Sequence, residues 1–401
     1  MKHMKTILGL AVAGSVLGLA APAMADDIKI GILLGFTGPL ENLSPPMADA
    51  AKLALKNVSD QGGIDGANLV ADTADDSCID ASVASASADK LINSDGDLAV
   101  VGAMCSGVAI AAANNVGIPS GTVMVSPSAT SPAFSTLDDK DLIYRTAPSD
   151  AYNGEVLAHI LKDHGIDNIA ITYINSDYGK GLADALAAAF TAGGGTVAAN
   201  VPHEDGKADY RPELGQLAAS GSTVLVDLAY ANGSGRTILQ QAIESGDWQT
   251  YVGGDGMVDD SLFQGLDASA LEGMIAERPG TPASDGTAVF NKIATDGGVK
   301  PDATYAPQSY DAAFLIALAA EKTGGKKDGM AQALRDVATA PGDVILPGEW
   351  KKAVDLIKAG KDINYEGASG PLEFDEHGDV PGVVTEMTVK DGHFVEVGEA
   401  K

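Results

Sequence analysis

Basic residues and histidines are scarce in this chain, and their scarcity excludes several classes of function. Among 401 residues, Lys and Arg number 26 against 55 Asp and Glu, which gives a formal net charge of −29 at pH 7. So acidic a chain is unsuited to nucleic acid and to anionic membrane surfaces. The six histidines are scattered and form no H-E-x-x-H pattern. The sequence therefore predicts no nucleic-acid partner, no metal site and no cofactor.

Motifs for catalysis are also lacking. No serine stands in a G-x-S-x-G elbow, and no Walker A lysine motif occurs. The run Gly193–Ala198 fits G-x-G-x-x-A, but it follows a predicted helix and leads into a strand. A dinucleotide fingerprint has the opposite order, so a glycine cap at a helix end explains this run better. The sequence predicts a protein that is not an enzyme.

Long apolar runs are missing except at the N-terminus. Lys2 and Lys5 precede an apolar run over residues 7–21, and Ala23-Met24-Ala25 follows. This order is typical of a secretory signal peptide, here residues 1–25 with cleavage before Asp26. The run is too short to span a bilayer securely. We expect an exported, periplasmic protein without direct membrane insertion.

Cysteine is nearly absent, with only Cys78 and Cys105. Two cysteines at this spacing do not resemble a metal site. Export makes a disulfide plausible, and closing this loop would contribute about 3.5 kcal/mol in the chain-entropy model. Two free buried thiols are the alternative to a disulfide.

Apolar strands and amphipathic helices alternate along the first two thirds of the chain. The first series comprises strand Ile28–Leu34, helix Met47–Ser59, strand Leu69–Thr73, helix Ala81–Ile92, strand Leu98–Gly102 and strand Thr122–Val125. The rhythm starts again after Thr146 with helix Asp150–His164 and strand Ile169–Tyr173. The pattern predicts an α/β fold of two Rossmann-like lobes, each a parallel sheet flanked by helices.

The last third has no lobe of its own. Helices are predicted over Ala288–Ala294, Ala306–Lys322, Met330–Thr339 and Glu349–Lys358, followed by strand-like pieces at Pro371–Phe374, Val383–Val389 and His393–Val397. These elements must pack on the earlier lobes. We therefore expect the chain to cross between the lobes more than once, through short hinge strands.

The stretch Gly102–Pro132 carries the candidate site. It places two hydroxyl-rich loops, Ser106-Gly107 and Ser128-Ala129-Thr130, at the carboxyl ends of neighbouring strands. Ligands bind at that edge of open α/β sheets, and hydroxyls with free N–H groups at a helix start suit a carboxylate. The alternative is that these residues are ordinary helix caps.

Several motifs resemble one family when they are taken in order and with their spacing. They are Thr37-Gly38-Pro39, Gln61-Gly62-Gly63-Ile64, Asp75-Asp76-Ser77-Cys78, Cys105-Ser106, Ser126–Thr130, Asp177–Gly181, Tyr310-Asp311-Ala312, Gly370-Pro371-Leu372 and Phe374-Asp375. Over essentially the whole mature chain, the sequence resembles the periplasmic leucine/isoleucine/valine-binding proteins. These are the type I solute-binding proteins of ATP-binding-cassette (ABC) importers.

The resemblance implies a two-lobed clamp that closes on an amino acid and delivers it to a membrane permease as a monomer. Three hinge crossovers are expected near Thr146, Glu277 and Thr385. The first lobe would comprise 26–146 and 277–384, and the second 147–276 and 385–401. The two cysteines match the pair that is bridged in the family.

The resemblance also assigns the ligand contacts of the first lobe. The hydroxyl and N–H groups of Ser106 and of Thr130 should hold the α-carboxylate. In the same loop, which includes Ala129, the carbonyl of Ser128 should accept from the ammonium group. Phe36, Leu43 and Met104 are candidates for the pocket of the ligand side chain.

From the second lobe, Tyr230 and Asp255 should complete the ammonium site and Tyr178 should close over the ligand. Asp255 departs from the family, which usually has Glu there, and an aspartate reaches less far by one methylene. A branched or other aliphatic amino acid is the expected ligand, with another small carboxylate or amide, such as an aromatic acid, as the alternative. A ligand sensor that reports to a receptor is the alternative to transport.

Overall fold

A five-stranded parallel sheet forms the first lobe. The computed structural model describes residues 26–400, so the predicted signal peptide over 1–25 lies outside the described residues. The strand order is β2-β1-β3-β4-β5. The bounds are β1 Ile28–Leu34, β2 Leu69–Asp75, β3 Val100–Gly102, β4 Met124–Ser126 and β5 Ile143–Arg145. Four parallel pairings join these five strands and confirm the predicted Rossmann-like sheet.

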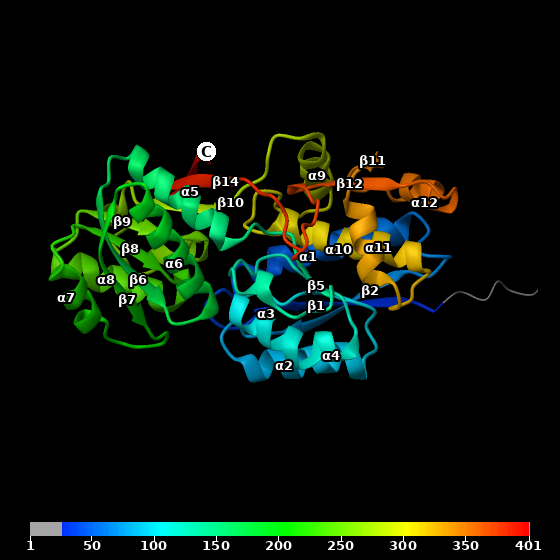
Figure 1. The fold of residues 1–401 in the computed structure, drawn as a ribbon, viewed down its shortest axis with the longest axis horizontal. Coiled ribbons are helices and arrows are strands. Elements are labelled where there is room, and N and C mark those ends of the chain that lie inside the picture. Colours follow the sequence, from blue (N-terminus) through cyan, green and yellow to red (C-terminus); the bar gives the residue numbers. More distant parts are fainter. Residues whose placement is uncertain (1–25, 401) are drawn as a thin grey trace, which may run out of the picture.

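A seven-stranded sheet forms the second lobe, with the order β15-β14-β10-β9-β8-β6-β7. Its strands are β6 Asn168–Ile174, β7 Thr196–His203, β8 Val224–Leu228, β9 Thr250–Gly253, β10 Ile275–Pro279, β14 Val384–Lys390 and β15 His393–Ala400. β6 to β10 are parallel, whereas β14 and β15 run antiparallel at one edge. In Figure 1 this green lobe lies on the left, and the red β14 joins it from the far end of the sequence.

Helices fill the connections between the strands. In the first lobe these include α1 Ser44–Asp60, α2 Ala81–Asp89, α3 Ser106–Ala112 and α4 Ile118–Ser120. In the second they are α5 Asp150–Asp163, α6 Asp177–Ala192, α7 Arg211–Ala218 and α8 Arg236–Ser245. No helix of the described chain is long and apolar enough to cross a membrane.

The chain passes between the lobes three times. It leaves the first sheet after β5, returns after β10 and leaves again before β14. Between the second and third passages, four helices pack back on the first lobe: α9 Asp285–Asp296, α10 Ala306–Thr323, α11 Met330–Ala338 and α12 Trp350–Lys358. α10 packs against α1, and residues 306–321 are buried throughout. A small sheet of β11 Asp343–Ile345, β12 Ile363–Gly367 and β13 Gly370–Pro371 completes this region.

Two local predictions were wrong. α1 begins at Ser44 rather than Met47, with Pro45 and Pro46 in its first turn. Proline is tolerated there because the first N–H groups of a helix have no intrahelical acceptor. The strand predicted over Leu98–Gly102 begins only at Val100; it ends at Gly102 as predicted, and beyond it the N–H of Met104 donates to the buried Asp76 carboxylate at 2.6 Å.

Cys78 and Cys105 form a disulfide, with their Cα atoms 5.1 Å apart. The bridge joins the loop after β2 to the residue before α3. It therefore fastens the backbone directly beside Ser106, the first residue of that helix.

Candidate ligand-binding site

The carboxyl-end edges of the two sheets face each other across a small cavity. β3 and β4 lead into the loops that carry Ser106 and Ser128, and β8 and β9 lead into those that carry Tyr230 and Asp255. The cavity is lined by Leu40, Leu43, Met104, Cys105, Ser106, Ser128, Tyr178, Tyr230, Asp255, Gly256 and Tyr305. Both lobes thus contribute to one small space at the edge where α/β sheets bind ligands.

Most of the residues named from the sequence meet at this cavity. Ser106, Ser128, Tyr178, Tyr230, Asp255, Leu43 and Met104 line it. Ala129 and Thr130 do not line the cavity in this structure; both are buried in the loop behind Ser128. Phe36 is half-buried against the core and does not line the cavity.

Serine hydroxyls fold the loop that follows β4. The Ser126 hydroxyl donates to the carbonyl of Ala103 at 2.6 Å and accepts from the N–H of Ala129 at 2.9 Å. The Ser128 hydroxyl donates to the carbonyl of Met104 at 2.9 Å. These bonds tie the loop to the end of β3, so the two hydroxyl-rich segments form one rigid wall.

Ser106 and Thr130 differ in how much of their hydrogen-bonding capacity is used. The Ser106 hydroxyl accepts from the N–H of Ser131 at 3.1 Å, which leaves its own proton free to donate. The Oγ1 atom of Thr130 is buried and makes no well-formed hydrogen bond among the described residues, but it lies near enough to the buried Asp150 carboxyl to lower the pKa of that group. A buried hydroxyl without a partner is costly, and such groups are uncommon in folded proteins.

Two tyrosines hold the carboxylate of Asp255. The Tyr178 hydroxyl donates to Oδ1 at 2.7 Å, and the Tyr305 hydroxyl donates to Oδ2. The N–H of Gly256 donates to the Tyr178 oxygen at 3.1 Å. Tyr230 stacks on Tyr178 with ring centroids 5.3 Å apart and planes 11° apart. A carboxylate accepts about four hydrogen bonds, so Asp255 keeps capacity toward the cavity.

The site is strongly acidic. Asp150 and Glu277 are buried behind Asp255, and the N–H of Asp255 donates to Oε1 of Glu277 at 3.3 Å. Burial and the charge of Asp255 raise the pKa of Asp150 to about 8 and hold the pKa of Glu277 well above its usual range. Burial also raises the pKa of Asp255, against the hydrogen bonds from its tyrosines. No lysine, arginine or histidine is among the described residues that line the cavity.

Part of the cavity lining is apolar. Leu40, Leu43 and Met104 come from the loop after β1, the residue before α1 and the loop after β3. All three are buried. They offer an aliphatic surface a short distance from the polar groups, which is the usual composition of a small-molecule site.

Sequence reasoning missed Tyr305, Asp150, Glu277 and Leu40. Tyr305 stands just before α10 with φ +62°, a left-handed conformation that bulky residues rarely adopt. No sequence pattern indicates this, and Tyr305 reaches Asp255 from 50 residues away along the chain. In the sequence, Asp150 resembles an ordinary acidic residue in the first turn of a helix, so nothing there indicates a role at the site.

Comparisons with known proteins identify the family of the chain. A model of the receptor family ligand binding region matches residues 46–389. The leucine-specific-binding protein of Salmonella typhimurium is 30% identical over 387 residues, which cover 94% of each chain. The chemotactic signal transduction system substrate-binding protein BasB of Halobacterium salinarum is 27% identical over 395 residues, covering 94% of this chain and 92% of BasB.

Solved structures share the fold. The crystal structure of a leucine-binding protein from Thermotoga maritima superimposes with a TM-score of 0.78 at 21% identity, covering 93% of this chain and 99% of the other. The likeness therefore extends over both lobes and the three passages between them. Together with the facing sheet edges and the cavity between them, these matches show that the chain belongs to the receptor ligand-binding-region family, among the Leu/Ile/Val-binding proteins with the type I periplasmic binding protein fold.

Proposed function

We propose that this protein is the periplasmic substrate-binding component of an ABC importer and captures a small aliphatic amino acid. The observation that carries the proposal is the charge of the cavity. Asp255 is buried beside two further carboxyl groups, and no basic side chain of the described chain lines the space in front of it. A ligand that brings its own positive charge compensates Asp255, whereas burial without a cation is costly.

The remaining groups fit the rest of an amino acid. The hydroxyls of Ser106 and Thr130 are donors for the α-carboxylate. The Ser128 carbonyl and Asp255 take the ammonium group. Leu40, Leu43 and Met104 contact an aliphatic side chain. Tyr178 and Tyr230 come from the second lobe, so the ligand is enclosed only when both lobes meet around it.

An aromatic acid is the alternative ligand. It shares the carboxylate but brings no positive charge, so Asp255 would remain buried without a cation. Although aspartate is shorter than the usual glutamate, the carboxylate of Asp255 still lies at the cavity wall, because Tyr178 and Tyr305 hold it there. We therefore favour the amino acid.

A thermal-shift panel tests the proposal. The mature protein is melted with L-leucine, L-isoleucine, L-valine and L-alanine, and separately with benzoate and 4-hydroxybenzoate. A ligand at 100 times its Kd stabilises the folded state by about 2.7 kcal/mol through mass action. We expect one or more of the amino acids to raise the melting temperature. Stabilisation by the benzoates alone would contradict the proposal.

A sensory role is the second candidate, and the likeness to BasB supports it. Both roles use the same closed clamp, so ligand affinity does not separate them. Uptake of radiolabelled amino acid separates the two roles when it is measured in cells that lack the protein and again after the protein is restored. Restoration of uptake supports transport through a permease, whereas a restored swimming response without uptake supports sensing. In either role we propose that the protein acts as an exported monomer.

A further inference from the structure

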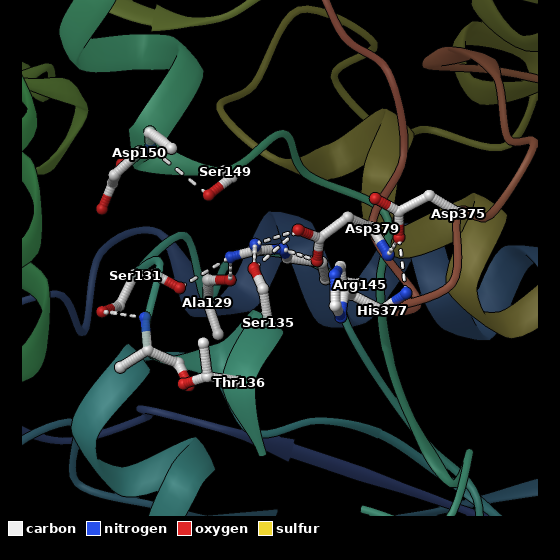
Figure 2. A network of polar contacts seen from close by, with 12 residues as sticks. Ala129, Ser131, Ser135, Thr136, Arg145, Ser149, Asp150, Asp375, His377 and Asp379 are labelled. Atoms are coloured by element: carbon white, nitrogen blue, oxygen red, sulfur yellow. Dashed lines mark hydrogen bonds and ion pairs between the residues drawn. The ribbon is translucent and has the colours of Figure 1, made fainter. Parts of the chain in front are cut away.

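A buried guanidinium lies directly behind the loop that carries Thr130. Arg145 is the last residue of β5 and is completely buried. Its Nη1 donates to the carbonyls of Ala129 at 3.2 Å and Ser131 at 2.9 Å, one on each side of Thr130. Figure 2 shows the guanidinium between this loop and Asp379.

Asp379 and Ser135 fix the guanidinium in turn. Nε and Nη2 of Arg145 each donate to one oxygen of Asp379 at 2.7 Å, a bidentate pair. Nη2 also donates to the Ser135 hydroxyl at 2.7 Å, and that hydroxyl donates to Asp379 at 2.7 Å. The backbone N–H of Arg145 donates to the carbonyl of Gly378 at 3.1 Å. The plane of the guanidinium is therefore set before any ligand arrives.

Because the peptide bond is planar, the direction of the Ala129 carbonyl also fixes the direction of the Thr130 N–H. In a trans peptide the C=O and the following N–H point in opposite directions. The carbonyl of Ala129 points at Arg145, so the N–H of Thr130 points away from it. That N–H donates to no residue among 26–400, whereas the carbonyl of Thr130 accepts from the N–H of Asp150 at 2.8 Å.

We propose that Arg145 is a positioning residue for the carboxylate subsite. It holds the peptide between Ala129 and Thr130 so that the Thr130 N–H and hydroxyl are aimed at the ligand carboxylate. Asp379 holds the guanidinium of Arg145 in the orientation that this contact requires. Because Asp379 lies shortly before β14, and Arg145 just before α5, the pair also joins two of the three passages between the lobes to the ligand loop. This inference rests on the proposed amino-acid ligand.

The test compares Arg145→Lys and Asp379→Asn with a matched control, Arg335→Lys. Arg335 pairs with Asp141 and donates to the carbonyl of Asp375, in the same segment that carries Asp379. It makes no hydrogen bond to the loop over 126–132 among the described residues. Lysine keeps the charge but loses the planar fork that spans the two carbonyls.

Two quantities are measured with L-leucine as the probe. The first is its Kd by titration calorimetry. The second is the amide proton shift of Thr130 on saturation, followed with ¹⁵N-threonine labelling and assigned with Thr130→Ser. We expect Arg145→Lys to weaken binding about 10- to 100-fold, the effect of one lost hydrogen bond to a charged group. We expect the ligand-induced downfield shift of the Thr130 amide to shrink with it.

Asp379→Asn should change both quantities in the same direction, and it carries the test if Arg145→Lys does not fold. Arg335→Lys should alter the Kd by less than about twofold, because a part-exposed ion pair outside the site contributes little. Weakened binding with an unchanged Thr130 shift would overturn the inference, since Arg145 would then act only on stability. Unchanged affinity in both variants would also overturn it. No response of the wild-type protein to L-leucine or the other amino acids would instead refute the proposed function.

Discussion

Replacing Asp255 by asparagine should stabilise the ligand-free protein and weaken ligand binding at the same time. Asp255 is buried with Glu277 next to it and Asp150 nearby, and each carboxyl raises the cost of ionising the others. An asparagine keeps nearly the same shape and can still accept from the Tyr178 hydroxyl. Each unit by which burial raises the pKa of Asp255 costs the folded state about 1.4 kcal/mol when the carboxyl ionises, and an asparagine does not carry that cost.

Binding should respond in the opposite direction. The amide removes a charge-assisted hydrogen bond to the ligand ammonium, about 1.5–3 kcal/mol, and leaves that ammonium without a counter-charge. We expect the Kd for L-leucine to rise about 10- to 1,000-fold. The assays are urea unfolding of the free protein and titration calorimetry at pH 7.

Asp227→Asn is the matched control. Asp227 on β8 is another buried carboxyl, whose pKa is raised well above its usual range by burial, and it does not line the cavity. The Asp227→Asn substitution should stabilise the free protein without changing the Kd for L-leucine. An Asp255→Asn protein that binds L-leucine within about threefold of wild type, a difference of only about 0.7 kcal/mol, would refute the ammonium assignment.

Three further perturbations have defined outcomes. The pKa of Asp150 is raised from 3.8 to about 8, so between these pH values the folded state keeps a proton that the unfolded chain releases. The free energy of unfolding therefore falls as the pH rises from about 4 to about 8, by up to about 1.4 kcal/mol per pH unit. Asp150→Asn should flatten the dependence of urea unfolding on pH between 5 and 8, and an unchanged slope would contradict the burial argument. Thr130→Ala should weaken L-leucine about tenfold but lower the melting temperature of the free protein only slightly, because Oγ1 makes no well-formed hydrogen bond and acts only weakly on the Asp150 carboxyl; a large drop in melting temperature would show a structural role instead. Reducing the Cys78–Cys105 bridge should lower the free energy of unfolding by about 3.5 kcal/mol, and equal urea midpoints with and without reductant would rule this out.

The fold was largely predictable from the sequence because its parallel strands are buried on both faces. Ile28–Leu34, for example, is apolar nearly throughout, and β1 has those bounds. Strand boundaries were less certain where side chains compete for backbone N–H groups. Asp76 accepts from the N–H of Met104 just beyond β3, and this contact spans 28 residues that no local pattern links.

The candidate site was predictable where its residues follow strands in a motif, and not where they meet through the tertiary fold. Ser106, Ser128 and Asp255 each follow a strand of the parallel sheets, so topology brings them to one edge. Arg145 and Asp379 are 234 residues apart and meet only because the chain returns to the first lobe. Tyr305 depends in addition on a backbone conformation that its sequence does not suggest.

The central claim is that one cavity recognises an ammonium group and a carboxylate together. Competition between L-leucine and 4-methylpentanoate, which has the same carbon skeleton without the amine, tests it most directly. With Asp255 buried and no basic side chain lining the cavity, L-leucine should bind at least about 100-fold more tightly, the effect of leaving one buried charge unpaired. Equal affinities for the two compounds would contradict the account.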